Sequence, residues 1–310
     1  MSLRNSVLLY RPSLSIWTAK RLDKAQSQKV TQDAGATDGS ARVHKDLLPD
    51  CTELDDVQKW ANSYRTFIYT NTAPWDDSGW RVGNVARHMD FIAESGDRIT
   101  QGYLLVDALL VKYQQAVAEA QFRLAHLFNP SDYPGEQEVR AKFRFSLDVM
   151  PLPTADDFRI VEGVDQSEVD RLIGEATSAT EQRIADAMAE AYKRLHGVVS
   201  KMASTLECYG DKTVKKFNDS LVGNIAELVA VMPALNLTND PKLAQLCDEA
   251  RSLATYSPVD LRKDEAVRAA AITEARALAD KFRDMVEQEE KTTVTRAKSD
   301  AALVADLMEV

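Results

Sequence analysis

The fold is decided by residues 85–127, which read VARHMDFIAESGDRITQGYLLVDALLVKYQQAVAEAQFRLAHL. Side chains spaced 3.5 residues apart on average stay on one face of a helix. Thirteen positions of this segment alternate in steps of four and three, and all but the glycine carry an apolar or aromatic side chain: Val85, Met89, Ile92, Gly96, Ile99, Tyr103, Val106, Leu110, Tyr113, Val117, Ala120, Leu124 and Leu127. The spacing predicts a single helix of roughly 66 Å that packs lengthwise on another helix.

A second long helix is predicted from Ser167, because an apolar stripe runs from Val169 to Leu206 at a mean spacing of about 3.7 residues. We expect the two helices to pair as an antiparallel hairpin. Alternating residues predict strands at 143–149 and 158–162, and a further strand near 13–17. The predicted fold class is therefore mainly α: an elongated helical bundle built on a long antiparallel helical hairpin, with a small β element.

Breaks in the pattern divide the chain into four predicted segments. Residues 1–50 form a basic N-terminal arm with a short strand, and residues 51–210 form the helical hairpin with its β tip. Residues 211–290 form a C-terminal helical region, in which prolines and Asn239 separate shorter helices. Residues 291–310 form a tail that begins with a polar stretch.

Charge and cysteine content narrow the class of protein. The net charge of −10 over 310 residues argues against broad binding to nucleic-acid backbones. Three cysteines without CxxC spacing suggest a reducing compartment. The sequence contains neither an apolar run long enough to cross a bilayer nor a signal-peptide core, so we expect a cytoplasmic protein without a membrane partner.

Catalytic motifs are missing from the sequence. It contains no GxGxxG, GxSxG or HExxH pattern, and its four histidines are too far apart to share a metal at helical spacing. Adjacent carboxylates can hold Mg²⁺, but in turns aspartate commonly bonds its own backbone. The adjacent aspartate pairs are Asp55-Asp56, Asp76-Asp77 and Asp156-Asp157. We therefore predict no enzyme activity, no cofactor and no catalytic or metal-binding residue, with a metal-dependent phosphoryl hydrolase left open.

The N-terminal arm supports an alternative function. Residues 1–30 hold six basic residues and one acidic residue, a local charge of +5 on a chain that is otherwise acidic. Basic and aromatic side chains together suit single-stranded nucleic acid, because cations meet phosphates and rings stack on bases. The candidate residues for this alternative are Arg4, Arg11, Lys20, Arg21 and Lys24, beside tryptophans such as Trp17 and Trp80.

Several short turns resemble those of an uncharacterised bacteriophage family of mostly helical proteins. The resemblance covers about residues 10–205 and rests on PWDDSGWR (74–81), DYP (132–134), KF (142–143), PLP (151–153) and DFR (157–159). It implies a phage protein made in the bacterial cytoplasm, and it brings no catalytic residues. In that family, genes sometimes lie near a MoxR-type ATPase of the AAA class and a protein with a von Willebrand-type domain.

We therefore expect a non-enzymatic helical assembly or interaction protein of a bacteriophage. It would form a homo-oligomer or bind phage or host proteins, including an AAA-type ATPase, through surfaces at the PWDDSGWR turn and the strand element. The residues expected to bind partners are Trp75, Asp76, Asp77, Trp80, Arg81, Phe158 and Arg159. The alternative is a single-stranded nucleic-acid-binding or annealing accessory protein that uses the basic arm.

Overall fold

The structure is a computed structural model that describes residues 6–153, 166–210 and 217–308, with side chains as far as residue 288. The protein is mostly helical, at 70%, as the sequence predicts. Dominant helices are combined with two sheets. The larger is a four-stranded antiparallel sheet of order β4 (Ala73–Pro74), β5 (Arg81–Asn84), β1 (Val7–Ser15) and β6 (Arg144–Pro151), and the smaller pairs β2 (Lys20–Asp23) with β3 (Val43–Asp46). Within the described ranges, no helix combines the length and apolar content that crossing a membrane requires.

The larger sheet contains two of the predicted strand regions. The region near 13–17 belongs to the end of the longer strand β1 (Val7–Ser15), and the predicted strand at 143–149 lies in β6 (Arg144–Pro151). Strand β6 pairs with β1, and β1 pairs antiparallel with β5 (Arg81–Asn84), so that Leu9 faces Val82. The segment 158–162, expected to be a further strand, lies outside the described residues.

The chain forms two compact units, each assembled from separate segments. Unit 1 contains residues 1–11, 68–91 and 149–310, and unit 2 contains residues 12–67 and 92–148. Four elements contribute residues to both units: strands β1 and β6, and helices α2 (Thr52–Asn71) and α3 (His88–Leu124). This division differs from the four consecutive segments expected from the sequence, which stay a prediction.

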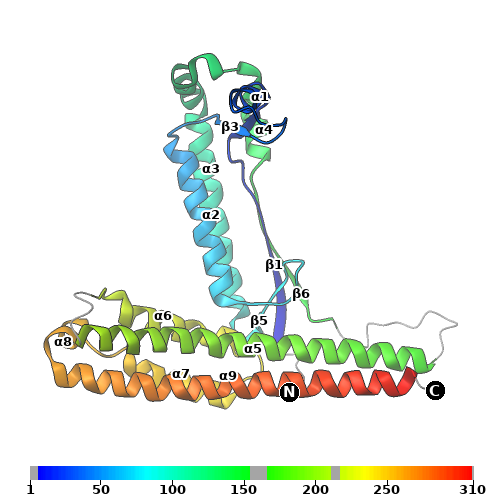
Figure 1. Ribbon diagram of the computed structural model, residues 1–310, viewed down its shortest axis with the longest axis vertical. Helices are drawn as coiled ribbons and strands as arrows, with labels where there is room; N and C mark the ends of the chain where they lie inside the picture. The colour runs from blue at the N-terminus through cyan, green and yellow to red at the C-terminus, as the bar shows by residue number, and fades with distance from the viewer. Residues whose placement is uncertain (1–5, 154–165, 211–216, 309–310) are drawn as a thin grey trace. The chain divides into compact units, whose positions relative to one another are not determined.

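Unit 1 is built on two long antiparallel helices, α5 (Gln166–Gly210) and α9 (Glu265–Met308) (Figure 1). The shorter helices α6 (Ser220–Leu235), α7 (Pro241–Leu253) and α8 (Pro258–Lys263) complete its apolar core. The stripe predicted for α5 is confirmed from Ile184 onward, where Ala187, Ala191, Leu195, Met202 and Leu206 are buried. Helix α9 packs on α5 through alanines and Phe282.

One prediction about the helices is wrong. The long antiparallel partner of α5 is α9, within unit 1, whereas most of α3 belongs to unit 2. Periodicity shows which face of a helix is apolar, and it does not show which helix covers that face. Helix α9 also continues to Met308, and so includes most of the segment 291–310 that the sequence predicts as a separate tail. No glycine or proline follows Pro258, so nothing in the sequence interrupts the helix.

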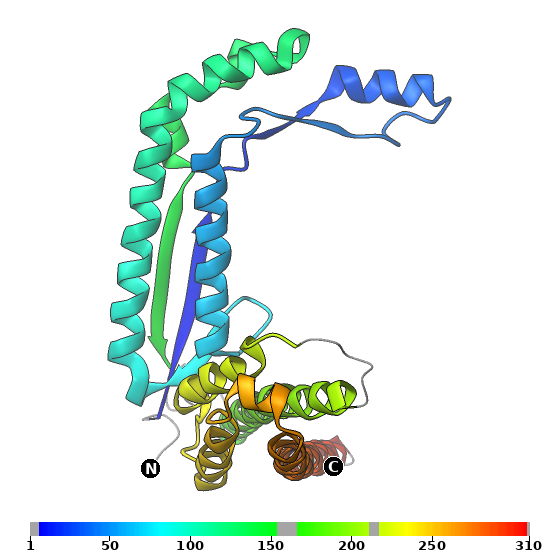
Figure 2. The same ribbon diagram turned by 90° about the vertical axis from the view of Figure 1, so that its left-hand side faces the viewer.

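In unit 2, α2 and α3 lie side by side, and β1 and β6 run along them (Figure 2). Trp60 joins the two helices, because its Nε1–H donates to the carbonyl oxygen of Arg98 at 2.9 Å. The Trp60 ring stacks on Tyr64 with centroids 5.6 Å apart and lies 4.5 Å from the Phe145 ring of β6. Gly102 of α3 faces this indole ring with no side chain between them.

The buried face of α3 agrees with the predicted seam only in its C-terminal half. Val106, Tyr113 and Ala120 are buried as expected. Nearer the N-terminus the seam residues Val85 and Met89 are exposed, and Phe91, Ser95 and Gly102 are buried in their place. A straight helix has 3.6 residues per turn, so its buried stripe drifts away from a strict 3.5-residue repeat.

The N-terminal part of unit 2 forms a small module of β2 (Lys20–Asp23), α1 (Lys24–Asp33) and β3 (Val43–Asp46) (Figure 2). Strand β2 follows Ala19 directly, and α1 begins where β2 ends. The 3-10 helix η4 (Pro130–Asp132) and α4 (Glu136–Ala141) complete the unit. The carboxylate of Asp132 is buried and pairs with Lys45 and Arg21, which fixes η4 to this module.

Candidate functional site

The PWDDSGWR segment forms a fixed hairpin turn in unit 1. Strand β4 (Ala73–Pro74) pairs with β5, and residues 75–80 connect them. Asp76 Oδ1 accepts hydrogen bonds from the Ser78 amide at 3.0 Å, the Ser78 hydroxyl at 2.8 Å and the Trp80 amide at 3.1 Å. Gly79 adopts a φ of +93°, which glycine tolerates best. The Asp76 carboxylate therefore holds its own turn.

Trp75 anchors the turn to the core. Its side chain is buried, with 8% of the residue exposed, and it belongs to the apolar cluster formed with α5. The guanidinium of Arg183, on α5, lies 5.4 Å from the Trp75 ring centroid. The sequence predicts Trp75 as a partner-binding residue; its burial leaves little of the side chain accessible to a partner, and the role stays a prediction.

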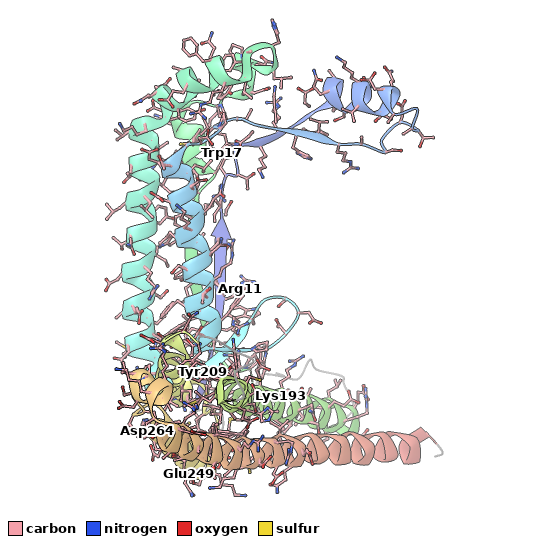
Figure 3. The ribbon with its side chains drawn as sticks, turned by 60° about the vertical axis from the view of Figure 1, so that its left-hand side comes forward. Arg11, Trp17, Lys193, Tyr209, Glu249 and Asp264 are labelled. Atoms are coloured by element: carbon pink, nitrogen blue, oxygen red, sulfur yellow. The ribbon has the colours of Figure 1, made fainter. Side chains whose placement is uncertain are left out.

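Trp80, in the same turn, is only partly buried and packs against the apolar cluster. The guanidinium of Arg11 lies 4.9 Å from its ring centroid. Arg11 is exposed on β1 (Figure 3), and Asp77 is exposed at the tip of the turn. The structure thus brings together Arg11, a nucleic-acid candidate, and Trp80, a partner-binding candidate.

Arg81 closes the C-terminal end of α2. Its Nε donates to Thr72 Oγ1 at 2.7 Å and its Nη2 donates to the Thr72 carbonyl oxygen at 2.8 Å, while its guanidinium lies 4.4 Å from the Tyr69 ring. Arg194 donates to the Tyr69 carbonyl oxygen at 3.0 Å. Burial, with the neighbouring charge of Arg194, lowers the pKa of Arg81 to about 10. Cations at a helix C-terminus satisfy its unpaired carbonyl groups, so the contacts of Arg81 are structural.

We call Arg11, Tyr69, Asp77 and Trp80 the turn cluster: Arg11 contacts Trp80, Asp77 lies in the turn, and Tyr69 contacts Arg81, the residue that follows Trp80. All four are at least partly accessible, with Tyr69 50% exposed. Sequence reasoning missed Tyr69, whose only signal was its position off the apolar stripe in the last turn of α2. It also missed Arg183 and Arg194, which support the turn from α5 and carry no local motif.

The other sequence candidates are dispersed. Phe158, Arg159 and Arg4 lie outside the described residues. Lys20 and Arg21 lie on β2 and Lys24 begins α1, all in unit 2. Arg21 forms an ion pair with the buried Asp132 at 3.1 Å, so part of the predicted basic arm is used within the fold.

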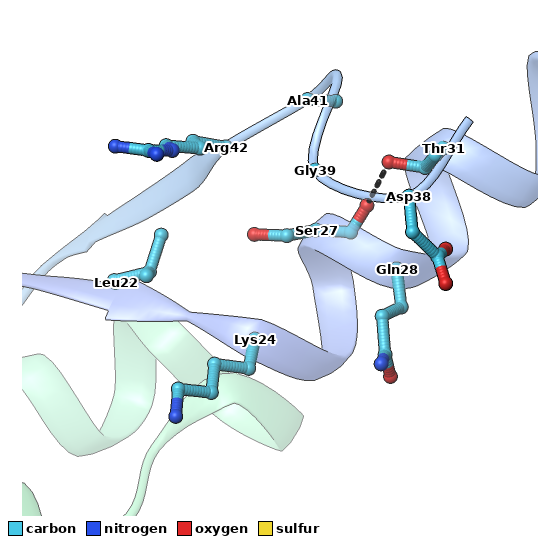
Figure 4. A pocket seen from close by; sticks show the side chains of 9 residues that line it. All are labelled: Leu22, Lys24, Ser27, Gln28, Thr31, Asp38, Gly39, Ala41 and Arg42. Atoms are coloured by element: carbon cyan, nitrogen blue, oxygen red, sulfur yellow. Dashed lines mark hydrogen bonds between the residues drawn. The ribbon is translucent and has the colours of Figure 1, made fainter. Parts of the chain in front are cut away.

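A pocket of about 240 Å³ lies beside α1 in unit 2 (Figure 4). Its hydroxyl groups are engaged within the module: Ser27 Oγ donates to the Asp23 carbonyl oxygen, and Thr31 Oγ1 donates to the Ser27 carbonyl oxygen at 2.8 Å. The Ser27 hydroxyl also accepts the Val43 amide at 2.9 Å. These contacts stabilise the module and do not converge on the cavity.

Within the described ranges, no three His, Cys, Asp or Glu side chains are grouped so that they could hold a metal ion. The pair Asp156-Asp157 lies outside those ranges. No protein-family model, curated protein or solved structure matches the chain. The bacteriophage resemblance of the turns therefore stays a prediction.

Proposed function

We propose that this chain is a non-enzymatic assembly or interaction protein that binds other proteins through the turn cluster. The observation that supports this proposal is the accessible Arg11–Trp80 stack on a turn held by Asp76 and anchored by Trp75. Tryptophan, tyrosine and arginine dominate the energetically important positions of protein interfaces. A rigid turn loses little conformational freedom on binding, which favours affinity.

The resemblance of the turns makes a bacteriophage protein the most economical setting for this proposal. In that setting the helical bundle of unit 1 is the scaffold that presents the turn. The first partner to test is the AAA-type ATPase that the resemblance associates with such genes, because arginines and aromatic rings bind carboxylates and apolar side chains of a protein surface.

The experiment compares the affinity of the wild-type chain and Trp80→Ala for the purified ATPase encoded nearest to this gene. We expect Trp80→Ala to weaken binding about 30-fold, the loss typical of an interface hot spot. Val259→Ala, which alters an exposed apolar residue on α8, is the matched control and should bind like the wild type. Equal affinity of Trp80→Ala and the wild type would exclude the turn cluster as the binding surface.

A second candidate function is single-stranded nucleic-acid binding, favoured by the same Arg11–Trp80 stack. It requires salt-dependent binding of oligonucleotides that weakens in Arg11→Ala and Trp80→Ala. Fluorescence anisotropy at low salt separates the two candidates. If the wild-type chain does not bind a labelled oligonucleotide at low salt, the nucleic-acid function is excluded. The proposal that the chain binds a protein partner is not affected by that result.

A further inference from the structure

Helix α3 carries a second, mostly apolar stripe on the face opposite its buried residues. Seven positions alternate in steps of three and four, and every one of them is exposed: Gln101, Leu104, Ala108, Val111, Gln115, Ala118 and Phe122. The three largest apolar side chains are among the most exposed in the described chain, at 64% for Leu104, 82% for Val111 and 86% for Phe122. We call these seven residues the outer seam.

The spacing of the outer seam is that of a helix pair in a coiled coil, where apolar residues recur every 3.5 residues. The seam is about 30 Å long, since each helical residue rises 1.5 Å. Single exposed apolar residues are common, but a continuous stripe indicates an interaction surface. The outer seam therefore fits a second helix laid along α3.

The charges beside the outer seam indicate which helix this is. Lys112 follows Val111 and Glu119 follows Ala118, so both lie along the same edge of the seam, and both are exposed. Gln115 donates to the Glu119 carboxylate at 2.9 Å, which holds that carboxylate at the edge. In an antiparallel pair of identical helices the same edges face each other, so Lys112 of one copy meets Glu119 of the other, twice by symmetry.

The opposite edge agrees with this arrangement. It carries Gln114 and Gln121, which are uncharged, and Asp107, which already pairs with Arg140 of α4. A parallel pair would instead place Lys112 and Glu119 against this second edge, without an available opposite charge for Glu119. Charge complementarity thus favours the antiparallel pair.

We propose that two copies of this chain associate through the C-terminal part of their outer seams, from Val111 to Phe122, as an antiparallel helix pair. The register that brings Lys112 beside Glu119 also sets Val111 of one copy against Phe122 of the second copy and Gln115 against Ala118. Large side chains then meet medium or small ones in each layer, as a close-packed interface requires. This proposal rests on the proposed assembly function and names the surface for its self-association.

The experiment measures molecular mass by sedimentation equilibrium between about 1 and 100 μM, the range in which a modest interface associates. The wild-type chain should form a dimer. Val111→Ser combined with Phe122→Ser should be monomeric throughout, whereas Val259→Ser, an exposed valine on α8, should dimerise like the wild type. All substituted positions are exposed, and circular dichroism verifies that helix content is kept.

Charge reversal tests the orientation. Lys112→Glu or Glu119→Lys alone places like charges together at both ends of the antiparallel pair and should weaken dimerisation about tenfold. The combined variant restores opposite charges and should recover the wild-type affinity. If the double variant stays weak, or if neither single variant has an effect, the antiparallel register is wrong.

The remaining outcomes separate this inference from the proposed function. If the Val111→Ser, Phe122→Ser variant still forms a dimer, the outer seam is not the dimer interface, although the chain does self-associate. A wild-type chain that is monomeric at every concentration overturns the self-pairing, and binding of a protein partner is then judged by the Trp80→Ala experiment alone.

Discussion

Replacing Gly102 by alanine tests the contact between α2 and α3 in unit 2. A Cβ atom at this position would lie 2.4 Å from Cζ2 of Trp60 and 2.5 Å from its Cη2, well inside van der Waals contact. The indole cannot easily move away, because it donates to the Arg98 carbonyl oxygen at 2.9 Å and lies between Tyr64 and Phe145. The Gly102→Ala variant must therefore separate the helices or displace the ring.

The size of the effect follows from three contributions. Overpacking costs about 1–3 kcal/mol, and loss of the indole hydrogen bond costs about 1 kcal/mol. Alanine is favoured over glycine inside a helix by about 1 kcal/mol, which opposes the loss. We expect the free energy of unfolding to fall by about 2 kcal/mol, measured by urea denaturation with circular dichroism and tryptophan fluorescence.

The matched control is Gly96→Ala on the same helix, where a Cβ atom would meet nothing within 4 Å. This variant should raise the free energy of unfolding by about 0.5–1 kcal/mol, through helix propensity alone. In a Trp60→Leu background, Gly102→Ala should become stabilising too, because the ring atoms it meets are gone. If Gly102→Ala stabilises the native chain as Gly96→Ala does, α2 and α3 are not in close contact at Gly102.

Three further predictions concern single side chains. Asp132→Ala leaves the Lys45 ammonium buried without its partner and should cost about 3 kcal/mol in urea denaturation, a loss that adding Lys45→Met should largely recover. Arg81→Ala removes charged hydrogen bonds from the C-terminal end of α2 and should lower the free energy of unfolding by about 2 kcal/mol, with Arg81→Lys falling between. Burial raises the pKa of Tyr10 to about 12, so between pH 10 and 12 the folded chain keeps a proton that the unfolded chain releases. Stability should therefore fall as pH rises through that range, and the fall should be smaller in Tyr10→Phe; an equal fall in both would assign it to other groups.

Local patterns predicted elements better than they predicted partners. The helix expected from Ser167 is α5, and the strand expected at 143–149 lies in β6, because apolar spacing and alternation lie within the elements themselves. The partner of α5 could not be found in this way. Alanine-rich α9 covers it, and alanines at helical spacing also fit an exposed helix.

The candidate site shows the same limit. The turn at 75–80 was visible in the sequence through its Asp, Ser and Gly residues. The sequence does not show which of the two tryptophans is more exposed, because Trp75 and Trp80 are the same residue type with similar neighbours. Burial of Trp75 depends on α5, which begins about 90 residues later in the chain, and no local pattern encodes that contact.

The pairing of α5 with α9 has a consequence for synthesis on the ribosome. More than 50 residues separate Gly210, the end of α5, from Glu265, the start of α9. At about 5–20 residues per second, the apolar stripe of a newly made α5 waits several seconds before α9 emerges to cover it. During that interval the apolar face of α5 is exposed to chaperones and to other nascent chains. Slow-translating codons after residue 210 should therefore increase aggregation of this protein more than the same codons placed before residue 166.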